Sequence, residues 1–173
     1  MSFKTLKPIL ILILWASPLV FIDLYSKHWV HQNITDESKE IVITDNIKIG
    51  KPHMNYWFIL SGDAEVPEYK RWFRNMVMFL IAFTCLWGQW QGFYWFDRLP
   101  WLLIRGGALG NTIDACFLGG VTDFIYISFS FMNYYVVPNL ADLFIFGGIL
   151  SLLLGWGTYL IFNYMNISIR RLF

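Results

Sequence analysis

Long runs of mostly apolar residues alternate with polar segments along this chain of 173 residues. Four such runs cover about residues 8–25, 75–93, 101–119 and 140–162. Each is close to the length of about 20 residues that a helix needs to cross the hydrocarbon core of a bilayer. The pattern therefore predicts an integral membrane protein of mainly α class. We expect residues 1–173 to form a single membrane domain built on a four-transmembrane-helix bundle.

The first run has two possible interpretations. Lys4 and Lys7 precede it, as they would precede the apolar part of a cleaved signal peptide. However, no small-x-small cleavage site follows the run, and Asp23 and Lys27 follow instead. This favours a span that is retained in the protein.

The composition agrees with a membrane protein. Charged residues make up only 14% of the chain, against about 25% in an average soluble domain. Aromatic residues reach 20%, which suits side chains at lipid–water boundaries. These values exclude a soluble enzyme, a disordered tail and a secreted disulfide scaffold. No basic patch stands out, so we expect no nucleic-acid partner.

The segment of about residues 28–70, between the first two runs, is too long for a plain connection. Residues 40–50 predict a hairpin that turns at Asp45 and Asn46. Residues 55–60 predict a further strand, and residues 68–75 a short helix at the membrane interface. We expect a small β-sheet on the membrane surface between the first and second spanning helices.

Four spans place both termini on one side of the membrane. The cytoplasmic side of a membrane protein is enriched in Lys and Arg, and the loop 120–139 has none, so we predict that both termini are inside and this loop outside. The segment 26–74 runs against this rule, because it contains seven basic residues: Lys27, Lys39, Lys48, Lys51, Lys70, Arg71 and Arg74.

Small residues at helical spacing predict where the spanning helices pack closely. Gly106 and Gly110 form one such pair, and Gly147, Ser151 and Gly155 form a second series.

Four acids lie within or beside the predicted spans: Asp23, Asp114, Asp123 and Asp142. An ionisable residue at the centre of a span costs about 2.5–3.5 kcal/mol on insertion scales, so such residues usually have a partner or a function. The topology brings Asp23, Asp123 and Asp142 to the outer face. If the third helix continued, Asp114 would lie about 13 Å from Asp123 along its axis.

Asp123 and Asp142 are the pair that could share a site. Two neighbouring carboxylates do not easily both ionise, so one keeps a proton while the other can activate a water, as in aspartic proteases. The alternative is that each carboxylate only caps a helix end, because Asp142 stands at the start of the fourth run. The residue spacing alone leaves both interpretations open.

Three motifs together resemble lipoprotein signal peptidase (signal peptidase II). Gly110-Asn111-Thr112-Ile113-Asp114, followed by Gly120-Val121-Thr122-Asp123, resembles the signature of that family's third helix. Asn139-Leu140-Ala141-Asp142 resembles its last motif, and Asp23-Leu24-Tyr25-Ser26-Lys27 the motif at the end of its first helix. The resemblance covers nearly the whole chain.

This resemblance implies an aspartic endopeptidase of the bacterial inner membrane that removes signal peptides from diacylglyceryl-modified prolipoproteins. It implies that Asp123 and Asp142 form the catalytic dyad on the extracytoplasmic face. The supporting residues would be Asn111, Asp114, Asn139, Asp23, Lys27 and Asn55. The outside sheet would resemble the family's substrate cradle. The resemblance implies no metal or organic cofactor, prolipoproteins and membrane lipid as partners, and a monomer.

The chain also departs from the family pattern. Ala115 stands where the family usually has Arg, and Leu24 where it usually has Gln. Bulky residues 56–59 follow Asn55 where the family is small. These departures motivate a second hypothesis, a catalytically weakened or inactive relative that binds lipoprotein or apolar peptide segments. A third hypothesis is a small proton-coupled carrier, although four spans without a broken-helix repeat make a poor transporter.

Overall fold

The computed structural model describes residues 3–56, 67–88, 95–129 and 134–164. In this part of the chain the helices are α1 (Phe3–Asn33), α2 (Glu68–Gly88), α3 (Trp95–Leu118) and α4 (Leu140–Tyr164). The strands are β1 (Ile41–Thr44), β2 (Ile47–Asn55), β3 (Val121–Phe129) and β4 (Tyr134–Val136), and a short 3-10 turn covers Glu37–Lys39.

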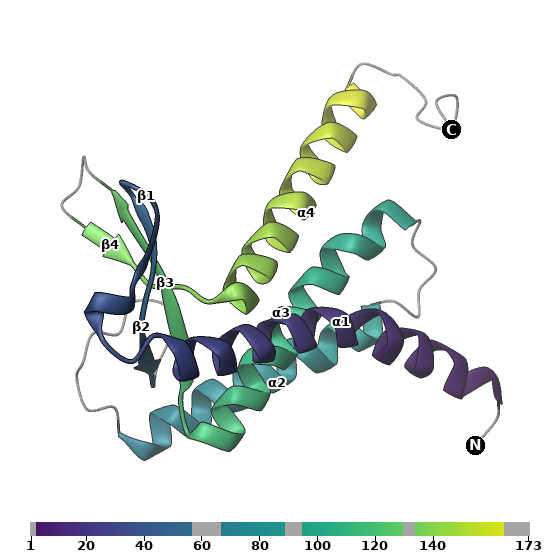
Figure 1. The fold of residues 1–173 in the computed structure, drawn as a ribbon. Helices are drawn as coiled ribbons and strands as arrows, with labels where there is room; N and C mark the ends of the chain where they lie inside the picture. Colours follow the sequence, from purple (N-terminus) through teal and green to yellow (C-terminus); the bar gives the residue numbers. More distant parts are fainter. Residues whose placement is uncertain (1–2, 57–66, 89–94, 130–133, 165–173) are drawn as a thin grey trace.

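The helices form a bundle in which α3 contacts each of the other three. The sheet lies at one end of this bundle, beside the end of α1 and the start of α4 (Figure 1). The helix α1 continues to Asn33, well past the predicted end of the first run. The predicted interfacial helix at residues 68–75 forms the beginning of α2, which continues without a break into the second apolar run.

The sheet is antiparallel, with the strand order β1-β2-β3-β4. The predicted hairpin is confirmed as β1 and β2, which turn at Asp45 and Asn46. The prediction of a separate strand over residues 55–60 is wrong for its first residue, because Asn55 is the last residue of β2. Residues 57–60 lie outside the described part.

The sheet predicted between the first two helices is confirmed for β1 and β2, but it has further strands from elsewhere in the chain. Its β3 and β4 come from the segment 120–139, which we expected to be a loop. That segment is rich in β-branched and aromatic residues, and pairing with β2 satisfies its backbone groups.

A sharp turn separates α3 from β3. Gly119 has a φ of 76°, a left-handed conformation that suits glycine at the end of a helix. The chain therefore reverses before Asp123, and the separation of about 13 Å expected for a continuous helix does not apply. Instead, the Thr122 amide donates to Asp114 Oδ2 at 2.6 Å.

Glycines set the closest helix contacts, but not all at the predicted positions. A Cβ at Gly106 would meet Leu19, and one at Gly110 would lie 2.5 Å from Asp23 Oδ2, so this pair is confirmed as the contact with α1. The prediction for Gly147 and Gly155 is wrong, because a Cβ there would meet nothing described closer than 4.0 Å. The close position on α4 is Gly148, where a Cβ would lie 2.5 Å from the Pro100 carbonyl oxygen.

The described part of α4 presents large apolar side chains to its surroundings. Phe146, Leu153 and Trp156 are all more than half exposed, and Trp156 reaches 72%. Among the described residues, the stretch Leu140–Thr158 is the one that meets the length and composition of a spanning helix. The count of four spans stays a prediction.

Candidate active site

Asp123 lies near the start of β3 and is 2% exposed. Both of its carboxylate oxygens accept hydrogen bonds from side-chain amides. Asn55 Nδ2 donates to Oδ2 at 2.9 Å, and Asn139 Nδ2 donates to Oδ1 at 2.7 Å. Asn55 is the last residue of β2, so the pairing of β2 with β3 brings these two residues together.

Asp142 lies in the first turn of α4 and forms a reciprocal cap with Asn139. The Asp142 amide donates to Asn139 Oδ1 at 2.9 Å, and the Asn139 amide donates to Asp142 Oδ2 at 3.2 Å. This arrangement satisfies two backbone donors at the start of the helix. Asp142 therefore does cap α4, but one of its oxygens remains directed to a different partner.

That partner is Asn111 of α3, whose Nδ2 donates to Asp142 Oδ1 at 2.8 Å. Asn111 Oδ1 accepts from Asn139 Nδ2 at 3.0 Å. Asn139 thus binds Asp123, Asp142 and Asn111 at once. The two carboxylates belong to one buried network of side-chain amides, which a pair of unrelated helix caps would not require.

Two further buried acids, Asp114 and Asp23, bind the backbone amides of the residues before Asp123 and Asp142. Asp114 Oδ2 accepts from the amide of Thr122, the residue before Asp123. Asp23 Oδ1 accepts from the amide of Ala141, the residue before Asp142, at 2.9 Å. These bonds tie β3 to α3 and the start of α4 to α1.

Lys27 connects these supporting acids to the amide network. Its Nζ lies 2.8 Å from Asp23 Oδ2 and 3.5 Å from Asp114 Oδ2, and it donates to Asn111 Oδ1 at 2.8 Å. All three charged side chains are buried. A buried cation shared between two carboxylates offsets part of the cost of removing these charges from water.

The environment of Asp123 favours its protonated form. Burial, and next to it the neighbouring Asp142 carboxylate, raise the pKa of this carboxyl to about 7. The hydrogen bonds from Asn55 and Asn139 and the charge of Lys27 oppose this change. Near neutral pH, the pair can therefore hold one proton between its two members. Such a pair can act as an acid and a base in the same reaction.

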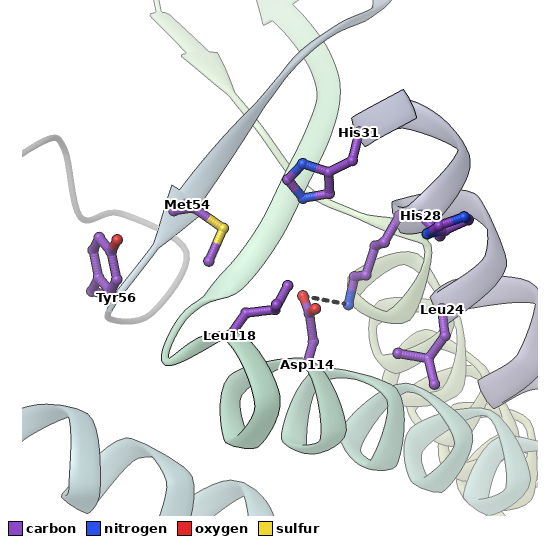
Figure 2. A pocket seen from close by; sticks show the side chains of 8 residues that line it. Leu24, His28, His31, Met54, Tyr56, Asp114 and Leu118 are labelled. Atoms are coloured by element: carbon purple, nitrogen blue, oxygen red, sulfur yellow. Dashed lines mark ion pairs between the residues drawn. The ribbon is translucent and has the colours of Figure 1, made fainter. Parts of the chain in front are cut away.

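A cavity of about 530 Å³ opens beside this network. Its walls come from α1, the end of β2 and the end of α3, and Asp114 points into it near its ion pair with Lys27 (Figure 2). The lining residues are Leu24, Lys27, His28, His31, Met54, Tyr56, Asp114 and Leu118. The described residues contain no group of three or more His, Cys, Asp or Glu side chains that could hold a metal ion.

The structure brings together all eight residues that the sequence singled out: Asp123, Asp142, Asn111, Asp114, Asn139, Asp23, Lys27 and Asn55. The structure describes both of the single positions that depart from the family pattern. Ala115 is buried on α3, and Leu24 lines the cavity. Of the bulky residues after Asn55, Tyr56 lines the cavity, and residues 57–59 lie outside the described part.

Sequence reasoning missed one residue, Arg74 of α2, whose Nη1 donates to the Asn55 carbonyl at 2.9 Å. The sequence offered only a weak signal for it: a basic residue directly before an apolar run, among several others in the same segment.

A family model described as signal peptidase (SPase) II matches residues 15–157. The chain belongs to the signal peptidase II family. Lipoprotein signal peptidase of Shewanella sp. (strain MR-4) is 32% identical over 151 residues, which cover 84% of each chain. Lipoprotein signal peptidase of Buchnera aphidicola is 29% identical over 142 residues, which cover 81% of this chain and 86% of the relative.

Solved structures agree on the fold of this signal peptidase II family member. A bacterial membrane enzyme determined by the in meso method at 2.3 Å resolution superposes with a TM-score of 0.69 at 22% identity. The match covers 91% of this chain and 92% of the other. A second such enzyme, at 1.9 Å resolution, has a TM-score of 0.64 at 24% identity.

Proposed function

We propose that this protein is a membrane aspartic endopeptidase that removes signal peptides from diacylglyceryl-modified prolipoproteins, cutting before the lipidated Cys. Membership of the signal peptidase II family supports the substrate class. The observation that carries the aspartic mechanism is the buried amide network that joins Asp123 to Asp142 through Asn139.

In this mechanism the dyad holds one proton near neutral pH. The ionised carboxylate takes a proton from a water molecule, whose oxygen attacks the carbonyl carbon of the scissile peptide. The protonated carboxyl donates a hydrogen bond to the carbonyl oxygen and stabilises the developing negative charge. A proton then passes to the leaving nitrogen, the C–N bond breaks, and the dyad again shares one proton.

The surrounding residues have positioning roles in this proposal. Asn55, Asn111 and Asn139 hold the two carboxylates by their amides. Asp23 and Asp114 hold the preceding backbone amides, and Lys27 neutralises these two supporting acids. Such fixed geometry matters because a small displacement of reacting groups costs a large factor in rate.

The topology is part of the proposal. Four spans with both termini inside would place the sheet and the dyad on the extracytoplasmic face of the bacterial inner membrane. The exposed apolar side chains of α4 would then contact lipid, and the sheet would hold the substrate at the membrane surface. A monomer with no cofactor is sufficient for this chemistry.

The test is cleavage of a diacylglyceryl-modified prolipoprotein in detergent or vesicles. We expect the wild type to cleave it and Asp142→Asn to lower kcat by at least about 100-fold, the lower range for loss of a general acid or base. Asp45→Asn is the matched control, because Asp45 is exposed at the hairpin turn, and its activity should be unchanged. Equal activity of wild type and Asp142→Asn would refute the assignment of the dyad.

A second candidate is a relative that binds lipidated or apolar peptides without turnover. The buried Ala115, in place of the family's usual Arg, and Tyr56 in the cavity wall favour it. It predicts peptide binding that Asp123→Asn leaves unchanged, and any turnover by the wild type would exclude it.

A further inference from the structure

Arg74 is a buried cation close to the candidate dyad. It lies in the second turn of α2 and is 2% exposed, among the largest fully buried side chains of the described chain. Nη1 donates to the Asn55 carbonyl at 2.9 Å. Nε and Nη2 both donate to Asn75 Oδ1, at 3.1 and 2.8 Å.

These partners satisfy the guanidinium with neutral groups. Burying a cation costs several kcal/mol unless opposite charges lie near. Among the described residues, Asp123 and Asp114 are the carboxylates whose charge acts on Arg74, and neither of them forms an ion pair with it in this part of the chain. An apolar side chain would fill the same space without this cost, so packing alone does not account for an arginine here.

A short chain of hydrogen bonds leads from Arg74 to the dyad. The guanidinium binds the carbonyl of Asn55, and the side chain of the same Asn55 donates to Asp123 Oδ2. Asn55 is the last residue of β2, where it pairs with Val121 of β3, and Arg74 adds a hydrogen bond to its carbonyl. Fixing the Asn55 backbone therefore fixes the direction of its amide.

The charge of Arg74 also acts on Asp114 of α3. Ala115 follows Asp114 directly and is buried, so that turn of α3 brings no cation of its own beside Asp114. The helices α2 and α3 pack together, and Arg74 enters from α2.

We propose that Arg74 is a positioning residue of the active site, which holds the Asn55 amide on Asp123 and stabilises the ionised form of that carboxylate. The proposal rests on the proposed peptidase function and extends it to a residue on a different helix.

Several charged or titratable groups face Asp123 from the elements packed around it. They are Lys27 and His31 on α1, His53 on β2, Arg74 on α2, Asp114 on α3 and Asp142 on α4. Removing the positive charge of Arg74 disfavours the carboxylate and moves the pH–activity profile to higher pH. Arg74→Lys keeps the charge but loses the fork, so the profile should stay in place.

The experiment measures kcat and KM against pH for the wild type, Arg74→Gln, Arg74→Lys and Lys70→Gln. Lys70→Gln is the matched control, because this substitution removes an exposed positive charge from the same helix. For Arg74→Gln we expect kcat about tenfold lower, KM within about twofold, and a profile moved to higher pH. Arg74→Lys should keep the wild-type profile, and Lys70→Gln should match the wild type throughout.

Two outcomes would overturn the proposal. One is an Arg74→Gln enzyme with wild-type kcat and profile. The other is a loss of kcat that Arg74→Lys shares in full, with both profiles unmoved, since this would indicate packing alone.

A second measurement separates this proposal from the proposed function. The infrared carboxyl band of Asp123, identified by its absence in Asp123→Asn, is titrated in the wild type and in Arg74→Gln. A wild type that cleaves no prolipoprotein would refute the proposed function. The action of Arg74 would still be supported by a band that persists to higher pH in Arg74→Gln, and refuted by a band that titrates as in the wild type.

Discussion

Replacing Asp123 by Asn should make the protein more stable at alkaline pH while it abolishes cleavage. The carboxyl of Asp123 has an ordinary pKa of 3.8, and burial together with Asp142 raises that pKa to about 7 in the folded protein. The folded state therefore holds this proton more tightly than the unfolded chain. As the pH rises from about 4 to about 7, the free energy of unfolding decreases because Asp123 loses this proton. Well above pH 7 the decrease is complete and stays constant.

The magnitude follows from the displacement of the pKa. Moving from 3.8 to about 7 corresponds to about 4 kcal/mol, of which about 2–3 kcal/mol develops between pH 5 and pH 8. An asparagine does not ionise and avoids this loss. The substitution also destabilises the protein by an amount that does not depend on pH. Asn55 and Asn139 each donate a hydrogen bond to one carboxylate oxygen of Asp123, and an asparagine at this position would have only one acceptor oxygen. That cost is about 1–3 kcal/mol.

The assay is unfolding of wild type and Asp123→Asn in the same detergent at pH 5 and at pH 8. We expect the variant to be equal to or less stable than the wild type at pH 5, and more stable by about 1–3 kcal/mol at pH 8. Asp45→Asn is the control, because this exposed carboxylate should give no pH-dependent difference. The reasoning is refuted if the stability difference between Asp123→Asn and wild type fails to grow with pH. A variant that no longer folds at pH 8 would show that Asp123 is a structural anion.

Two further substitutions test the support of the site. Lys27→Met should destabilise the protein by about 3–5 kcal/mol, because Asp23 and Asp114 would remain as buried carboxylates without their cation. Unfolding measurements should show partial recovery of this stability when Asp23→Asn is added. A Lys27→Met variant as stable as the wild type would contradict the shared ion pair. Gly148→Ala should cost about 1–3 kcal/mol, because the new Cβ would lie 2.5 Å from a carbonyl oxygen of α3. The adjacent Gly147→Ala has room and should be neutral or stabilising, so equal thermal unfolding of the two variants would contradict this packing.

The apolar runs predicted the helices because helix formation and apolar composition are properties of neighbouring residues. The start of α4 at Leu140 agrees with its predicted start, and the hairpin of β1 and β2 follows from its alternation and its turn. The same local reasoning extended the helix pattern through Gly119 and treated residues 120–139 as a loop. It could not detect that β2 would pair with β3, since this pairing joins residues about 70 positions apart.

For the site, the sequence by itself identified the acids that a membrane segment does not tolerate without a reason, and its motifs identified their amide and lysine partners. Only the tertiary structure decided how they meet: Asn139 between the two carboxylates, Lys27 between the two supporting acids, and Gly148 rather than Gly147 against α3. Arg74 became visible only there, because its importance depends on a strand end and a carboxylate from other parts of the chain. Residue types and local spacing limit which chemistry is available, whereas the direction of each side chain depends on packing and hydrogen bonds between segments that are distant in the sequence.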